Sequence, residues 1–174
     1  MLLLIVNING KLNYNIMNSY LTFQLGAESF ALNVKNVINI LEMYKITKVP
    51  KMPKYVKGAI NLRGEVLTVI DTRLKFGMEE TKITKNTCIL VLDVNISSNK
   101  VKIGVLVDMV NEVIELDENT IKPPATIGEK YNNEFIIGMI LNNDKFTMLL
   151  DINKVFSTEE IISIENIKEP AIEV

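Results

Sequence analysis

The side chains most often used in catalysis are scarce in this chain of 174 residues. Histidine is absent, which removes the commonest general base, the serine–histidine triads and most zinc sites. The single cysteine, Cys88, lies in an apolar run without a partner at metal-ligand spacing, so we interpret it as an inert residue of a reduced protein. The sequence contains no glycine-rich phosphate-binding loop. We therefore expect no catalytic residues, no metal site and no cofactor.

Acidic residues also have structural explanations. Glu79–Glu80 falls in a polar linker, and Glu159–Glu160 falls in the first turn of a predicted helix, where the helix dipole favours carboxylates. Asp71 and Asp151 each follow an apolar strand and precede a short predicted helix, which is the place of an N-cap residue. Because the same residue type recurs at both places, we favour capping over acid–base catalysis, and we do not expect an enzyme.

The segment from Gly58 to Gly77 recurs later in the chain, from Gly138 to Phe156. Glycine, aspartate and phenylalanine keep one offset in the two copies, because 138 − 58, 151 − 71 and 156 − 76 are all 80. Two copies of one supersecondary unit predict a duplicated architecture.

Arg63 is present in only one of the two copies. It lies at the tip of the predicted Asn61–Gly64 turn, where the second copy has Asn143. Two interpretations stay open, a solvated turn residue and an anchor for a protein contact, because a guanidinium binds carboxylates bidentately. Arg73, which Asn153 replaces, is expected to pack or pair within its own half.

Apolar periodicity predicts a mainly β structure. Residues 20–25 with 30–32, and residues 88–92 with 101–107, are expected to form two hairpins. In residues 33–41 the apolar positions have helical spacing, so we expect a short amphipathic helix with Asn33 as its N-cap, and residues 108–114 occupy the equivalent place. Many short strands separated by turns predict two five-stranded, SH3-like β-barrels packed side by side, with short helices.

Three segments are expected along the chain. Residues 1–18 form a leader that is disordered or misannotated, with Met17 as an alternative initiator. Residues 19–156 form a single domain of two barrel subdomains, with a boundary near 78–87 and with strand exchange between the halves left open. Residues 157–174 form a C-terminal helix and tail, because Ser157 and Glu160 have capping-box spacing.

The charge and hydropathy of the chain indicate where the protein is located and argue against some classes of partner. The net charge is −2 with a pI near 5.3, and we interpret the Lys and Arg residues as scattered, which argues against nucleic acid. The apolar start, Met1–Val6, is too short to span a bilayer or to serve as a signal peptide. We expect a cytoplasmic protein without direct membrane insertion.

The chain resembles the CheW-like proteins over about Tyr20 to Glu160. The segments that carry the resemblance are Lys57–Gly64, Val69–Gly77, Val49–Pro53, and Gly104–Asp108 with Val110 and Val113. The resemblance implies two SH3-like barrels and a cytoplasmic, non-enzymatic chemotaxis adaptor recruited to membrane-associated receptor arrays. Such an adaptor couples membrane chemoreceptors to a histidine kinase and helps assemble the signalling array.

The resemblance also implies two binding sites on this chain. The kinase's regulatory domain would bind one face of the first barrel, at Val37, Asn39, Leu41 and Gly58. The cytoplasmic tip of the chemoreceptor, a helical hairpin, would lie in the groove between the barrels, at Arg63, Ile89, Gly104, Val110 and Val113.

Asn39 is the main departure from the family pattern, because many members carry a glutamate there. Either an ion pair with the kinase is lost, or the partner has changed with it. Two other readings stay open. One is a detached regulatory domain related to the kinase or to a receiver-fused coupling protein, and the other is an unrelated small-barrel protein that binds or converts small ligands.

Overall fold

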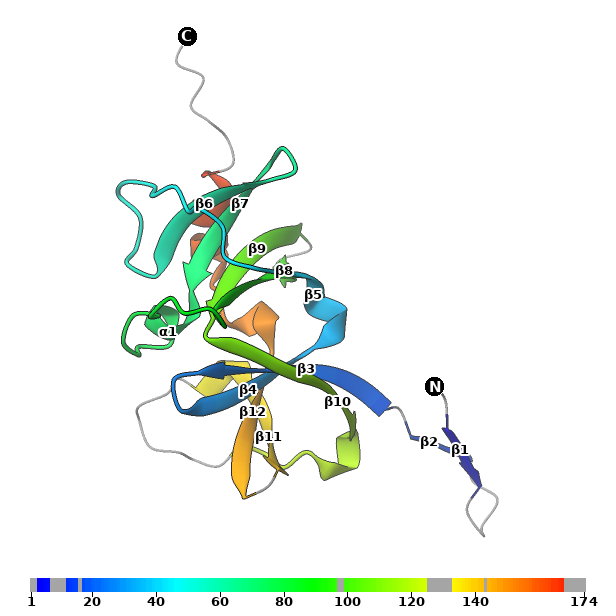
Figure 1. Cartoon of the computed structure of the whole chain (residues 1–174). Helices are drawn as coiled ribbons and strands as arrows, with labels where there is room; N and C mark the ends of the chain where they lie inside the picture. Colours follow the sequence, from blue (N-terminus) through cyan, green and yellow to red (C-terminus); the bar gives the residue numbers. More distant parts are fainter. Residues whose placement is uncertain are drawn as a thin grey trace.

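Two five-stranded sheets form the body of the molecule in the computed structural model, which describes residues 3–6, 12–15, 17–96, 99–124, 133–142 and 144–167. We call them sheet I and sheet II; they lie one above the other in Figure 1. Sheet I has the order β5-β8-β9-β7-β6, with β5 (Val37–Leu41), β6 (Val56–Leu62), β7 (Glu65–Asp71), β8 (Cys88–Ile96) and β9 (Asn99–Val107). Sheet II has the order β10-β3-β4-β12-β11, with β3 (Met17–Leu25), β4 (Glu28–Asn33), β10 (Met109–Asp117), β11 (Ile136–Asn142) and β12 (Lys145–Leu150). The predicted mainly β fold with two five-stranded units is confirmed.

Each sheet contains strands from both halves of the chain. Strand β4 of the first half pairs in parallel with β12, and β7 pairs in parallel with β9 of the second half. The 78–87 segment, which we predicted as the boundary, connects β7 to β8 within sheet I. Sequence halves and sheets therefore do not coincide.

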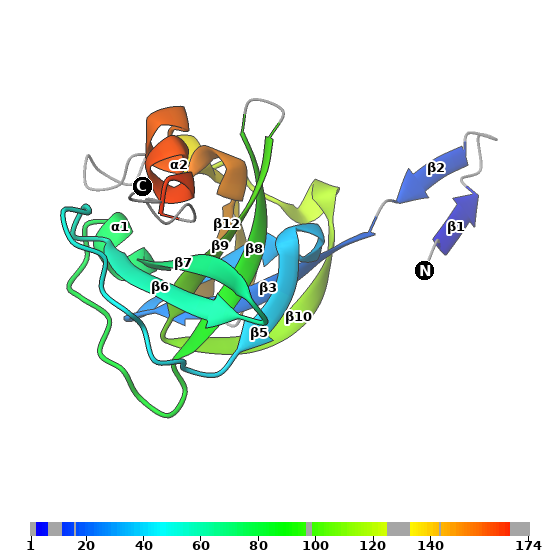
Figure 2. The same cartoon turned by 90° about the horizontal axis from the view of Figure 1, so that it is seen from above.

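The predicted leader includes a small separate sheet. Strand β1 (Leu3–Val6) pairs antiparallel with β2 (Leu12–Asn15), and this hairpin lies apart from the two large sheets in Figures 1 and 2. The other residues before Met17 lie outside the described residues. Strand β3 begins at Met17.

The repeated glycines mark places where another segment crosses a hairpin strand at close range. A Cβ on Gly58 would lie 2.1 Å from the Thr47 carbonyl oxygen, and one on Gly138 would lie 2.3 Å from Ile121 Cγ2. In both copies the residue after the glycine bridges the crossing segment, as Thr47 with Ala59 and as Lys122 with Met139. The repeat thus encodes one hairpin-and-crossing unit in each sheet.

The conserved aspartates of the repeat cap short helical turns, as predicted. Asp71 accepts a hydrogen bond from the Leu74 backbone N–H at the start of α1 (Thr72–Lys75), with Oδ1 and N 3.2 Å apart. Asp151 accepts one from the Asn153 backbone N–H, 3.1 Å away, at η4 (Ile152–Lys154). Asp71 is fully buried and also binds Thr81. Both carboxylates therefore have a structural role as N-caps.

The expected helix over 33–41 is wrong. Asn33 does cap a helical turn, since its side chain accepts from the Lys35 N–H, but this turn, η1 (Val34–Asn36), ends after three residues. Val37–Leu41 then pairs with β8 as strand β5. The equivalent 108–114 segment is likewise in a strand, β10. Four of the five residues in β5 are Val, Ile or Leu, and the β-branched ones favour a strand once a partner edge is available.

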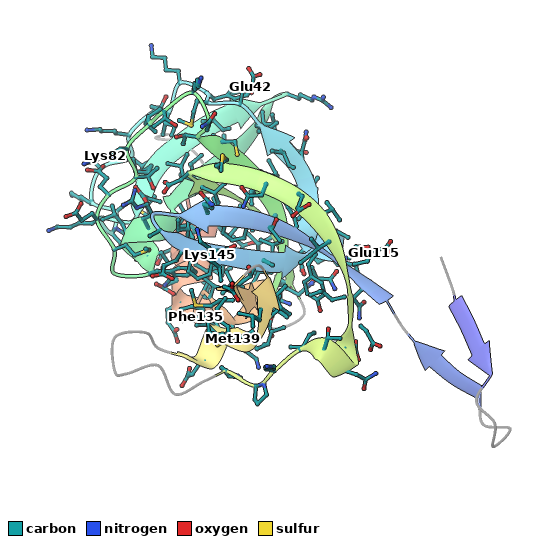
Figure 3. The ribbon with its side chains drawn as sticks, turned by 60° about the horizontal axis from the view of Figure 1, so that its bottom comes forward. Glu42, Lys82, Glu115, Phe135, Met139 and Lys145 are labelled. Atoms are coloured by element: carbon teal, nitrogen blue, oxygen red, sulfur yellow. The ribbon has the colours of Figure 1, made fainter. Side chains whose placement is uncertain are left out.

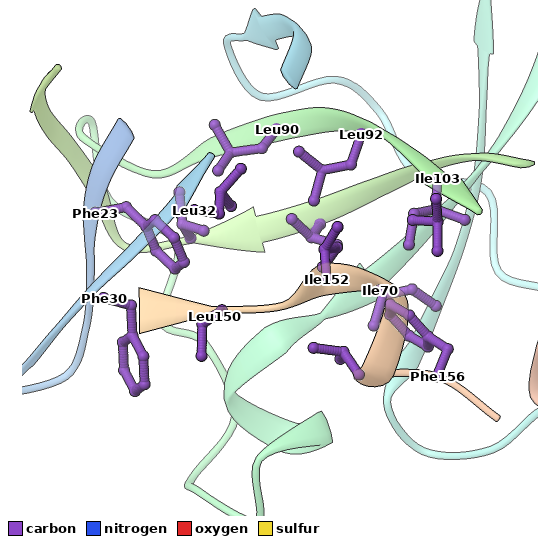
Figure 4. Packing of buried hydrophobic residues seen from close by; sticks show 14 of the residues in the cluster. Phe23, Phe30, Leu32, Ile70, Leu90, Leu92, Ile103, Leu150, Ile152 and Phe156 are labelled. Carbon is purple, nitrogen blue, oxygen red and sulfur yellow. The ribbon is translucent and has the colours of Figure 1, made fainter. Parts of the chain in front are cut away.

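The largest of three clusters of buried apolar residues in the described part of the chain joins the two halves (Figure 4). Phe76 packs against Phe30 and Phe135, with ring centroids 5.6 and 4.8 Å apart. Its counterpart in the repeat, Phe156, is also buried. The aromatic positions of both copies therefore serve packing.

An ion pair also joins the halves. Arg73 Nη1 lies 3.4 Å from Asp108 Oδ2, and the same oxygen accepts the Gly26 backbone N–H. The expectation that Arg73 pairs within its own half is wrong, because Asp108 belongs to the second half. Strand exchange brings α1 next to the end of β9, which sequence order alone does not reveal.

The predicted C-terminal helix is α2 (Thr158–Glu165), with residues 168–174 outside the described part of the chain. Its capping box is confirmed, because Ser157 and Glu160 exchange side-chain and backbone hydrogen bonds. Ile161 and Ile164 are buried, and Thr68 Oγ1 donates to the Ile164 carbonyl over 3.4 Å. The helix is thus fastened to sheet I.

Candidate functional site

Strand β5 presents an apolar edge to solvent. It pairs only with β8 in sheet I and is the outermost strand there. Ile38 and Ile40 are 49% and 44% exposed, whereas Val37 and Leu41 are half-buried. Large exposed apolar side chains on an edge strand are the kind of surface that binds another protein. We call Val37–Leu41 the β5 face.

Asn39 has a local role on this face. Its Oδ1 accepts the backbone N–H of Ile40, 2.8 Å away, and its side chain is exposed. The β5–β8 register shifts between Val37 and Asn39, which is a bulge that interrupts regular pairing. A bulge and a side-chain bond to the edge N–H both reduce the tendency of β5 to add further strands. The β5 face is therefore suited to side-chain contacts.

Gly58, the fourth predicted kinase-binding residue, is buried beneath the segment that follows β5. Its φ is +142°, and the Thr47 carbonyl occupies the space a side chain would need. It has no surface to offer a partner in this structure. Its effect on binding would come from fixing the path of residues 42–57.

Arg63 projects from the β6–β7 turn as predicted. The Asn61 side chain accepts the Gly64 N–H over 2.8 Å, which closes the turn, and Arg63 and Gly64 have φ of 54° and 88°. Arg63 is exposed, and among the described residues it makes no hydrogen bond or ion pair. The backbone of the turn is thus fixed, and the Arg63 guanidinium extends from it without a partner among the described residues.

A hollow of about 590 Å³ lies between the β6–β7 turn and β5. Its lining includes Arg63 and Asn39, which the sequence assigned to different partners. The full set of lining residues is Ile38, Asn39, Leu62, Arg63, Gly64, Glu65, Val66, Leu67, Val91 and Lys102. Lys102 pairs with Glu65 at its rim, 3.3 Å away. The two predicted sites therefore adjoin at this hollow, which we call the Arg63 hollow.

Ile89 and Gly104, predicted for receptor binding, lie inside sheet I. Ile89 is 0% exposed, and a Cβ added to Gly104 would lie 2.9 Å from the Cγ2 atom of Ile89. Ile89 is also the β8 partner of Leu41. These two residues support the back of β5, and in this structure neither reaches the surface.

Val110 and Val113 lie on β10, which is an edge strand of sheet II. Val110 is half-buried against the main core, and Val113 is 56% exposed. A register shift between them accompanies two hydrogen bonds between Thr22 and the Glu112 backbone. The bulge leaves Val113 outward, so of the five predicted receptor contacts, Arg63 and Val113 are the exposed ones.

The described residues show little that could serve catalysis. They contain no cluster of three or more His, Cys, Asp or Glu side chains that could hold a metal ion. Burial raises the pKa of the half-buried Cys88 thiol, which disfavours its reactive thiolate. Hydrogen bonding from Lys57 lowers the pKa of Glu80, which is the opposite of what a general acid needs.

Ile38 and Ile40 were not predicted as surface residues. On a helix, Ile38 shares a face with buried positions, whereas on a strand it alternates with Val37 and Asn39. The available signal was the three β-branched residues among 37–40, which favour a strand. Reading that segment as a strand would have placed both isoleucines on one face, but only the tertiary structure shows that this face is exposed.

No helix among the described residues is long and apolar enough to cross a membrane. The sequence pattern that defines the CheW-like domain matches residues 19–160. The chemotaxis protein CheW of Klebsiella aerogenes is 28% identical over 148 residues, covering 85% of this chain and 87% of that protein. The chemotaxis protein CheW of Helicobacter pylori is 31% identical over 141 residues, covering 80% and 82%.

A solved structure has the same fold. The crystal structure of the scaffolding protein TtCheW from Thermoanaerobacter tengcongensis aligns with a TM-score of 0.72 and 29% sequence identity. The alignment covers 83% of this chain and 91% of that one. Both sheets are therefore part of a shared architecture.

Proposed function

The chain belongs to the CheW-like family and is a non-enzymatic chemotaxis adaptor, and from this premise we propose how its surface is divided between two partners. The β5 face binds the regulatory domain of a histidine kinase. The β6–β7 side of the Arg63 hollow, with Arg63 itself, and the outward side of β10 bind the cytoplasmic tip of a chemoreceptor. Through these contacts the protein is recruited to receptor arrays at the membrane.

The single observation that carries the proposal is the exposed isoleucine pair on the β5 face. Ile38 and Ile40 are each more than two-fifths exposed on a strand whose outer edge is open. Burying two such side chains at an interface removes apolar area from water, worth roughly 25 cal/mol per Å² before the costs of association. A partner with an apolar patch of matching shape would gain most of its affinity there.

The receptor-binding part rests on Arg63 and Val113. Arg63 offers free donors on a rigid turn, and an arginine is a common anchor at protein interfaces. Val113 offers an apolar contact of the kind that a helical hairpin makes in a groove. Ile89 and Gly104 act from behind, by holding β5 and β9 together.

Binding of each isolated partner to single variants tests this division. Ile40→Asp should weaken binding of the kinase regulatory domain by about tenfold or more, because a charge replaces a central apolar anchor. Arg63→Glu should weaken binding of a receptor-tip fragment without lowering the melting temperature. Isothermal titration calorimetry gives both affinities.

Two substitutions serve as matched controls. Ile162→Asp changes an isoleucine that is 53% exposed on α2, and Lys145→Glu reverses an exposed charge on sheet II. Both controls should bind like the unmodified protein. The proposal fails if Ile40→Asp binds the kinase domain normally, or if Ile162→Asp weakens binding as much.

A further inference from the structure

The segment that joins β5 to β6, together with the start of β6, carries a row of lysines at intervals of three residues. They are Lys45, Lys48, Lys51, Lys54 and Lys57. With Glu42 as its only acidic residue, the 42–57 segment has a net charge of +4 (five lysines minus one glutamate) in a chain of net charge −2. The remaining residues therefore sum to −6. The basic residues are therefore not scattered as predicted, and we call residues 42–57 the lysine loop.

The structure holds the lysine loop in a fixed path. Thr47 exchanges two backbone hydrogen bonds with Ala59, of 2.9 and 2.8 Å, and the Tyr55 carbonyl accepts the Asp71 N–H over 2.7 Å. Met43 and Ile46 pack against the buried cluster of sheet I. Lys45, Lys48, Lys51 and Lys54 are all exposed.

Most of the positive charge on the loop is unpaired. Lys57 forms an ion pair with Glu80, but no carboxylate of the described residues pairs with the other four lysines. The hydrogen bond and the charge of Lys57 lower the pKa of Glu80 against an opposing effect of desolvation, and the charge of Lys48 adds a smaller lowering. The positive charge of the loop therefore acts on the adjacent segment as well.

The lysine loop continues the β5 face. It begins where β5 ends at Leu41 and carries Tyr44, which is 45% exposed. Ile83, in the neighbouring 78–87 segment, is 55% exposed. Figure 3 places Glu42 and Lys82, which mark these two segments, at the end of the molecule opposite Phe135 and Met139. A partner seated on Ile38 and Ile40 would therefore also meet the start of the lysine loop.

We propose that the lysine loop is an electrostatic docking element for an acidic surface on the protein that binds the β5 face. This inference rests on the proposed function, which makes that protein the kinase's regulatory domain. Asn39 is neutral where the family resemblance implies a glutamate, so no acidic side chain of β5 offsets the lysines. The partner of this chain should carry carboxylates opposite residues 45–54, which would be a charge pattern particular to this pair.

The proposal favours a protein over an anionic membrane because the lysines border an exposed apolar strand on a rigid scaffold. Charged residues around an apolar centre are the usual anatomy of a protein interface. Charged residues at the rim of an interface mainly increase the association rate and determine which partner is bound. Their effect weakens as the salt concentration rises.

The test compares two double charge reversals in the full chain. Lys45→Glu with Lys48→Glu alters the loop, and Lys122→Glu with Lys145→Glu alters two exposed lysines connected with sheet II. Stopped-flow or surface plasmon resonance measures association with the kinase regulatory domain at about 50 and about 300 mM salt. We expect the unmodified protein and the control to associate more slowly at high salt. The loop variant should associate about tenfold more slowly at low salt and should lose most of this salt dependence.

Each other outcome overturns a distinct statement. If the unmodified protein binds and the loop variant associates equally fast, the lysine loop is not a docking element, although the β5 face remains one. If the unmodified protein shows no binding to the kinase domain, the proposed function fails and the inference with it. If the loop reversal abolishes binding only to vesicles containing an anionic phospholipid, the lysines serve a membrane and the proposal is wrong.

Discussion

At the scale of single residues, several residues that were predicted to bind a partner have an internal structural role. Gly58 and Gly104 were expected at binding sites, yet both are buried against neighbouring atoms. Arg63 is the residue whose exposure and lack of internal partners match its expected role. A residue that matters for binding can therefore act either by touching the partner or by shaping the segment that does.

Gly58→Ala separates these two roles. The added Cβ would collide with the Thr47 carbonyl at a φ of +142°, so we expect the free energy of unfolding to fall by about 2–4 kcal/mol. Gly64→Ala is the matched control, because its φ is +88° and nothing lies within 4 Å of the added atom. It should cost about 1 kcal/mol. Urea denaturation measures both, and equal losses would contradict the internal role of Gly58.

At the scale of elements, helix α2 depends on a small polar cluster. Glu160 accepts hydrogen bonds from Tyr55 (2.7 Å), from Lys75 (2.5 Å) and from the Ser157 backbone. Lys75 also lies 4.8 Å from the centre of the Tyr55 ring. The cluster joins the first turn of α2 to α1 and to the end of the lysine loop. Loss of its charge should loosen the helix from sheet I.

The pH dependence of stability tests this cluster. Burial raises the pKa of Glu160, but the hydrogen bonds from Lys75, Ser157 and Tyr55 outweigh it and leave the pKa below its ordinary value of 4.5. A lowered folded-state pKa stabilises the protein above about pH 4.5 and loses that contribution as the pH falls through the folded value. Glu160→Gln should therefore reduce stability at pH 7 by about 1 kcal/mol and should make the difference from the unmodified protein shrink below pH 4.5. Thermal melts from pH 7 to pH 3 measure it.

Glu159→Gln is the control for this prediction. Glu159 is exposed in the same turn and does not contact Tyr55 or Lys75. Hydrogen bonds from its own backbone N–H and from Ser157 also lower the pKa of Glu159, but water screens this exposed carboxylate, so its replacement should give a smaller acid-induced difference. If both variants respond alike to pH, the charge of the turn matters and the cluster around Glu160 does not.

The sequence predicted the elements whose signals are local. The capping box of Ser157, the N-cap of Asp71 and the hairpin around Gly26 all depend on neighbouring residues, and all are confirmed. Strand β5 was mistaken for a helix because its apolar spacing fits both periods. The segment forms a strand because it pairs with β8, which lies about fifty residues later in the sequence. Partner strands of that kind are not encoded in a short window.

The sequence could indicate some residues of the candidate site, but it could not indicate how they are arranged in space. Arg63 and Val113 are exposed as a contact requires, while Ile89 is fully buried. No periodicity of residues 88–92 could distinguish a buried strand from a groove wall. That Asn39 and Arg63 line one hollow follows from the placement of β5 beside β8, with the β6–β7 turn folded over it. Only tertiary structure reveals that the two predicted sites adjoin.

At the scale of the whole molecule, strand exchange makes the two sheets one body. Strands β3 and β4 leave the first half to join sheet II, and β8 and β9 leave the second half to join sheet I. The pair Arg73–Asp108 and the stack of Phe30, Phe76 and Phe135 add further connections. A rigid body of this kind would hold two partners in a fixed relation, which is what coupling a receptor to a kinase requires.

Simultaneous binding is the most direct test of this account, because the two proposed sites meet at the Arg63 hollow. A receptor-tip fragment is immobilised, and retention of the kinase regulatory domain is measured with increasing amounts of the protein. We predict that the kinase domain is retained only in its presence, and that Ile40→Asp and Arg63→Glu each abolish retention while keeping the native fold. Binding of either partner alone, with displacement of one by the other at saturation, would contradict the adaptor mechanism proposed for these two faces.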